Sequence, residues 1–88
     1  MSSLAELEEA YLSTSRQLHD SARRAWEAKA QVITAYLAVH HPEQKVEIQP
    51  IEDNLLAHDV RFPDAGIAQS RMLAQEVAAY LQYLLDKG

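Results

Sequence analysis

The chain has 88 residues, a formal net charge of −5 at pH 7 and no cysteine. Autonomous domains span about 50–250 residues, so we expect residues 1–88 to form a single domain. The absence of cysteine excludes disulfides, thiol catalysis and cysteine-based zinc sites, and it suits a reducing compartment. The acidic balance disfavours nonspecific binding to nucleic acid, because that binding takes a basic surface.

The N-terminal residues carry no basic region followed by an apolar one, which is the pattern of a secretory signal. No stretch approaches the roughly 18 apolar residues that span a bilayer. We therefore expect a cytoplasmic protein that makes no contact with a membrane.

The first predicted helix spans about residues 4–40. Ser3 followed by Glu6 matches a capping box, in which each side chain accepts a hydrogen bond from a backbone N–H that the helix leaves unpaired. Pro42 disfavours helical geometry for the residue before it and marks the end. A helix of this length measures roughly 55 Å at 1.5 Å per residue.

The two halves of this predicted helix differ in their apolar faces. Residues 22–39 carry a broad apolar face, which indicates packing against elements on two sides. The N-terminal half carries a narrow stripe with the spacing of a helix–helix seam. Four residues form this seam: Leu4, Leu7, Tyr11 and Leu18.

The central segment alternates apolar and polar residues with a period of two, which predicts a β-hairpin over about residues 45–62. Asp53 and Asn54 would then lie in the reversal, and Pro50 would occupy an edge or strand-end position. An alternative is a short helix that starts at Pro50 and carries Glu52 and Asp53 in its first turn.

The last predicted helix spans about residues 65–86, with Asp64 as its N-cap. Its apolar residues recur at helical spacing, while Met72 and Tyr83 lie on the opposite, polar side. The predicted fold class is α+β, mainly helical, with a long N-terminal helix, a central β-hairpin and a C-terminal helix packed antiparallel on the first.

The lengths of the two predicted helices indicate how much of the N-terminal seam the last helix can cover. A last helix of roughly 33 Å covers only part of a 55 Å partner, so the seam would face water unless a second chain covers it. We therefore expect a homodimer through the seam, with Met72 and Tyr83 as a second candidate contact. The alternative is a break near residues 13–15 that folds the N-terminal turn back onto the core.

No motif for catalysis or phosphate binding occurs, so the sequence predicts a protein that is not an enzyme and takes no cofactor. His40 and His41 diverge on the helix and are best placed to stabilise its negative C-terminal end rather than to bind a metal. His58 shares a predicted strand face with apolar residues. A small-molecule or metal site near His58, Trp26 and Tyr36 remains an alternative.

Three arginines in the first helix suggest a second alternative, a nucleic-acid-associated regulator that uses Arg16, Arg23 and Arg24 across a dimer. Against this alternative, Asp20 and Glu27 lie at helical spacing from Arg23 and neutralise much of its field. The favoured hypothesis is that the protein is a small non-enzymatic protein–protein interaction module, such as an adaptor, an inhibitor or an assembly or regulatory factor. Its expected partners are a second copy of the chain and another protein.

Overall fold

The computed structural model describes residues 3–16, 22–51 and 54–87, with the side chains of residues 15–25 and 50–58 outside the description. Three helices and a two-stranded antiparallel hairpin make up this part of the chain, so the mainly helical α+β fold class is confirmed. In chain order the elements are α1 (Leu4–Arg16), α2 (Ala22–His40), β1 (Glu47–Ile51), β2 (Asn54–Arg61) and α3 (Ile67–Lys87).

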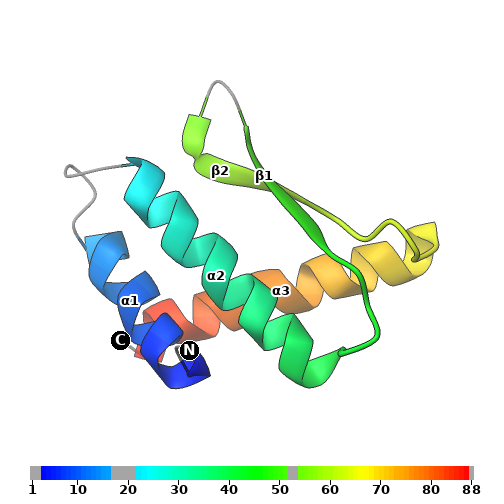
Figure 1. Cartoon of the computed structure of the whole chain (residues 1–88), viewed down its shortest axis with the longest axis horizontal. Helices are drawn as coiled ribbons and strands as arrows, with labels where there is room; N and C mark the ends of the chain where they lie inside the picture. The colour runs from blue at the N-terminus through cyan, green and yellow to red at the C-terminus, as the bar shows by residue number, and fades with distance from the viewer. Residues whose placement is uncertain (1–2, 17–21, 52–53, 88) are drawn as a thin grey trace.

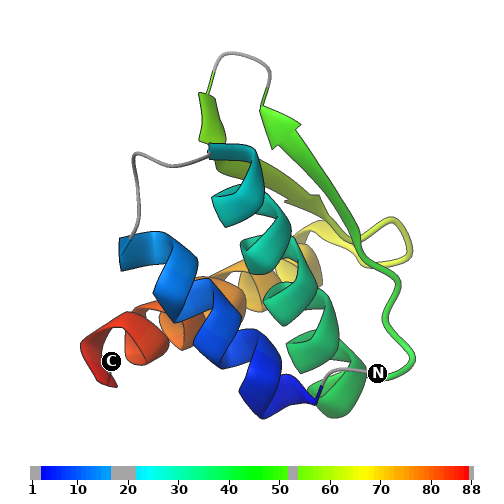
Figure 2. The same ribbon diagram turned by 60° about the vertical axis from the view of Figure 1, so that its left-hand side comes forward.

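The single helix predicted over residues 4–40 is wrong, because two helices, α1 and α2, occupy this range. They lie side by side and run in opposite directions (Figures 1 and 2). The alternative, in which the N-terminal segment folds back onto the core, is confirmed, although α1 continues to Arg16, past the predicted break at residues 13–15. The Thr14 hydroxyl in α1 donates to the carbonyl oxygens of Ala10 and Tyr11, so it is satisfied within the helix.

A local signal accounts for the start of α1 but not for the start of α3. The Glu6 N–H donates to Ser3 Oγ at 3.2 Å, which confirms Ser3 as the N-cap of α1. The predicted cap Asp64 is wrong, because α3 begins at Ile67 and the Ser70 N–H makes its first-turn bond to the carbonyl of Gly66. Asp64 instead approaches Lys45, with 3.8 Å between the carboxylate oxygen and the ammonium nitrogen.

The central hairpin is confirmed, and the alternative helix at Pro50 is wrong. β1 pairs with β2 in a register that places Ile48 opposite Val60, and both side chains pack against the core. On the outer face Glu47 lies opposite Arg61. Pro50 lies opposite His58, next to a register shift, where the missing N–H of a proline is tolerated.

The third helix crosses behind α2 and α1 in both views (Figures 1 and 2), while the hairpin lies on the side of α2 away from α1. The core therefore forms where these elements converge. Its centre is made of Val32, Ile33 and Leu37 from α2 together with Leu84 from α3, which are almost fully buried. Around them lie Tyr11, Phe62, Leu73, Val77 and Leu81.

Candidate functional site

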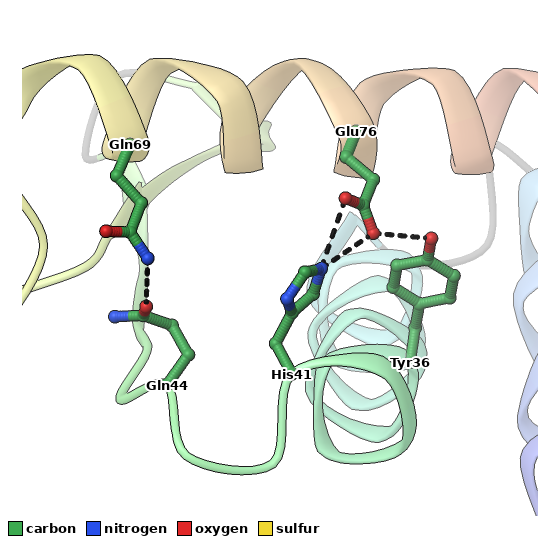
Figure 3. Close-up of polar contacts among 5 residues, drawn as sticks. All are labelled: Tyr36, His41, Gln44, Gln69 and Glu76. Atoms are coloured by element: carbon green, nitrogen blue, oxygen red, sulfur yellow. Dashed lines mark hydrogen bonds and ion pairs between the residues drawn. The ribbon is translucent and has the colours of Figure 1, made fainter.

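Glu76 on α3 joins two groups from the C-terminal end of α2 (Figure 3). The Tyr36 hydroxyl donates to Glu76 Oε2 at 2.7 Å, and His41 Nε2 lies 3.0 and 3.1 Å from the two carboxylate oxygens. Because an ionised carboxylate only accepts hydrogen bonds, Nε2 of His41 carries the proton in this arrangement. Beside this group the Gln69 amide donates to Gln44 Oε1 at 3.2 Å, which adds a second link across the same junction.

A second carboxylate extends the network to α1. The Tyr80 hydroxyl donates to Glu8 Oε2 at 2.5 Å, and the Tyr80 ring stacks on the Tyr36 ring with centroids 4.0 Å apart. Glu8, Tyr36, His41, Glu76 and Tyr80 are called the tyrosine–carboxylate cluster below. The cluster ties all three helices together through side chains that are only partly buried.

Three members of the cluster, Tyr36, Glu76 and Tyr80, have pKa values that are shifted away from neutrality. The hydrogen bond from Tyr36, followed by the one from His41, lowers the pKa of Glu76. Burial, with the hydrogen bond to Glu76 as a smaller cause, raises the pKa of Tyr36 to about 12. Burial and the bond to Glu8 likewise raise the pKa of Tyr80. At neutral pH the carboxylate of Glu76 is thus ionised and both phenols are neutral.

These protonation states suit a structural role more than a catalytic one. A general acid at neutral pH takes a carboxyl group whose pKa is raised, whereas the pKa of Glu76 is lowered. Within the described part of the chain, no group of three or more His, Asp or Glu side chains could hold a metal ion.

The structure places most of the predicted seam inside the molecule. Tyr11 is only 6% exposed and belongs to the core, and Leu4 and Leu7 are partly buried against it. The prediction that these residues lack intramolecular cover is therefore wrong, because the fold-back of α1 supplies the cover. Leu18 lies outside the described residues.

The second candidate contact, on α3, is exposed as predicted. Met72 is 70% exposed and Tyr83 is 58% exposed. Met72, Ala79 and Tyr83 are separated by seven and four residues, which aligns them along one side of a helix with 3.6 residues per turn. These three residues are called the outer face of α3. At the C-terminal end of this face, the Lys87 ammonium lies 5.8 Å from the centroid of the Tyr83 ring.

The remaining predicted site residues are not brought into one site. The side chains of His58, Arg16, Arg23 and Arg24 lie outside the described part of the chain, so these hypotheses stay predictions. Tyr36, a member of the alternative ligand site with His58 and Trp26, donates a hydrogen bond to Glu76.

Trp26 presents a different feature. Its indole Nε1 is buried and makes no hydrogen bond to any residue in the described ranges. A buried donor without a partner costs about 1–3 kcal/mol, so this nitrogen weakens the packing between Trp26 and its surroundings.

Sequence reasoning missed Glu8, Glu76 and Tyr80 as partners in a network. No local spacing signals their contacts, because Glu76 lies 35 residues from His41 and Tyr80 lies 72 residues from Glu8. The one available signal was the placement of His40 and His41 at a helix end, where polar side chains can meet a neighbouring helix.

In comparisons with known proteins, the chain matches no protein-family model, no curated protein and no solved structure. Among the described helices, none combines the length and the apolar character that a membrane span takes.

Proposed function

We propose that the protein is a small non-enzymatic interaction module that forms a homodimer through the outer face of α3. The observation that carries this proposal is the pair of exposed side chains Met72 and Tyr83 on one side of the helix. Two large apolar groups aligned in this way on a polar helix surface are typical of a contact between proteins. This surface takes the role predicted for the N-terminal seam, because Leu4, Leu7 and Tyr11 pack within the molecule.

The outer face is complementary to itself when two copies of α3 run antiparallel. A twofold axis between Val77 and Ala78 places Met72 of one copy opposite Tyr83 of the other, twice. A thioether on an aromatic ring contributes about 0.3–1.5 kcal/mol, and the small side chain of Ala79 lets the two helices approach closely.

The same arrangement also matches the charges along α3. Arg71 of one copy comes close to Asp86 of the other, because their positions are nearly symmetric about the axis. Such exposed pairs contribute about 0–1 kcal/mol each, so they select the antiparallel direction more than they add affinity.

The lowered pKa of Glu76 disfavours this carboxyl group as a general acid at neutral pH, which is compatible with a non-enzymatic role. The absence of cysteine supports placing the protein in the cytoplasm, where disulfides are not maintained. A dimeric module of this kind would present two copies of its other surfaces to a further protein partner.

Analytical ultracentrifugation of the wild type and of two charged variants tests the homodimer and its direction. Met72→Lys and Tyr83→Glu should each give monomers, because each places a charge against an apolar side chain of the second copy. In a mixture of the two variants, antiparallel packing sets the new ammonium opposite the new carboxylate and leaves one Met–Tyr pair intact. The mixture should therefore form a heterodimer.

Gln31→Lys provides a matched control, because Gln31 is exposed on α2 away from the outer face. This variant should remain dimeric. All variants should keep the wild-type circular dichroism spectrum, since substitutions at exposed positions change stability by about 0.5 kcal/mol or less. A wild-type protein that sediments as a monomer at every accessible concentration contradicts the proposal, and so does a mixture that stays monomeric.

A further inference from the structure

A groove on the opposite side of α3 from Met72 and Tyr83 has the features of a ligand site. Its volume is about 440 Å³, and its walls include Ala78, Leu81 and Leu85 from α3 and Val60 from β2. Leu85 is 44% exposed there, so the groove opens to solvent along an apolar wall. Pockets for small molecules typically measure about 300–1,000 Å³ and have mostly apolar linings, which fits this size and composition.

Among the described residues that line this groove, Lys29 is the one with a charged side chain. Lys29 belongs to the core-facing side of α2, three residues before Val32 and four before Ile33, and both of these are fully buried. Within the described residues the Lys29 ammonium makes no hydrogen bond and no ion pair. Burial without a compensating partner lowers its pKa.

A cation held at the edge of an apolar surface without a counter-charge is energetically unfavourable. A lysine on a helix normally extends its stem over apolar neighbours and keeps its charge in water. The side chain of Lys29 is partly buried and lines the groove, so its ammonium lies beside the apolar wall rather than on the open surface. An anion bound in the groove would give the ammonium the partner that the described residues do not supply.

We propose that the groove binds a small amphiphile with a carboxylate group. The carboxylate pairs with the Lys29 ammonium, and the apolar body lies along Ala78, Leu81 and Leu85. This site goes beyond the interaction module proposed above, because it uses a different side of α3 and takes a small molecule. The two proposals therefore fail independently.

Binding of decanoate and of its uncharged analogue decanol, both below the concentration at which they form micelles, tests the site. Trp26 is the only tryptophan of the chain and lies three residues before Lys29 on α2, so we expect its fluorescence to change when a ligand binds beside Lys29. We expect decanoate to bind at least tenfold more tightly than decanol. A rise in melting temperature with decanoate concentration provides an independent readout.

Three variants assign the contacts. Lys29→Met keeps an unbranched side chain without the charge and should reduce the affinity for decanoate to that for decanol, while Lys29→Arg should keep most of the preference. Ala78→Phe fills the groove and should weaken the binding of both compounds. Lys45→Met is the matched control, because Lys45 is exposed and lies outside the groove, and it should bind decanoate as the wild type does.

Three results would overturn the proposal. They are equal affinity of the wild type for decanoate and decanol, unchanged decanoate affinity in Lys29→Met, and no binding of either compound. If neither compound binds and Ala78→Phe alters the sedimentation of the protein, a second copy covers the groove instead. Loss of the homodimer without loss of decanoate binding would contradict only the function proposed above.

Discussion

Glu76 accepts hydrogen bonds from two side chains that reach it from the end of α2. Its carboxylate replaces the water that Tyr36 and His41 would otherwise bind. Hydrogen bonds to a charged group contribute about 1.5–3 kcal/mol, and the 37% exposure of the Glu76 side chain lets water compete for them. The net stabilisation therefore lies toward the lower end of that range.

Replacing Glu76 by glutamine should lower the free energy of unfolding at pH 7 by about 1 kcal/mol. The amide has one acceptor oxygen and no charge, so it cannot serve Tyr36 and His41 equally well. Urea denaturation measures the change. Glu43→Gln, at an exposed position in the connection from α2 to β1, is the control and should leave stability within about 0.5 kcal/mol of the wild type.

Glu76 should also make stability depend on pH in the acid range. Its pKa in the folded protein is lowered below the ordinary value of 4.5, so the unfolded chain takes up the proton first as the pH falls. The contribution of Glu76 is complete above about pH 4.5 and is lost as the pH falls through the lower, folded-state pKa. The difference in unfolding free energy between the wild type and Glu76→Gln should therefore be smaller at pH 3 than at pH 7. An equal difference at both values would contradict this assignment.

For single residues, the sequence predicts which side chains are exposed more readily than which side chains form hydrogen bonds with each other. The polar side of a helical pattern correctly placed Met72 and Tyr83 at the surface, since helical periodicity alone decides which side a residue occupies. The bonds of Glu76 and Glu8 depend on how α3 crosses the other helices, and no periodicity encodes a crossing.

Among the elements, the hairpin and the Ser3 cap of α1 follow from neighbouring residues, whereas the break between α1 and α2 and the start of α3 do not. Alternation with a period of two placed Ile48 and Val60 on one face without reference to the rest of the fold. Residues 17–21 contain no proline and no glycine, so the helical pattern continues through them. Their only terminus signal is the pair Asp20 and Ser21, residue types that favour N-caps, just before α2 begins.

The break changes the role of the N-terminal stripe from contact surface to core. A stripe spaced for a helix–helix seam is satisfied equally well by a neighbouring helix of the same chain. Here α2 and α3 provide that neighbour, and Tyr11 becomes one of the buried residues.

Truncation of Tyr11 to alanine should therefore destabilise the protein strongly. Removing a buried aromatic side chain costs about 3 kcal/mol or more, because the lost contacts leave a cavity that closes only partly. Thermal or urea denaturation measures the loss, with the exposed neighbour Glu9→Ala as the control. If Tyr11→Ala instead dissociated a dimer and kept the stability of the folded monomer, the packing of α1 within one chain would be wrong.

At the scale of the whole molecule, the net charge of −5 affects the affinity of the proposed homodimer. Like net charges repel at distances within the Debye length, which falls from about 30 Å at 0.01 M salt to about 3 Å at 1 M. The proposed contact between Met72 of one copy and Tyr83 of the other is apolar and would lose nothing to this screening. Added salt should therefore screen the repulsion between the two net negative charges without weakening the apolar contact.

The homodimer should consequently become tighter as salt rises from 0.02 to 0.5 M. The exposed pairs between Arg71 and Asp86 weaken over the same range, but they contribute only about 0–1 kcal/mol each. Sedimentation equilibrium at several salt concentrations measures the dissociation constant. Binding to nucleic acid through Arg16, Arg23 and Arg24 would show the opposite trend, because released counterions make that affinity fall steeply with salt. A dimer that dissociates on adding salt would show that charge pairs, and not the outer face of α3, hold the two copies together.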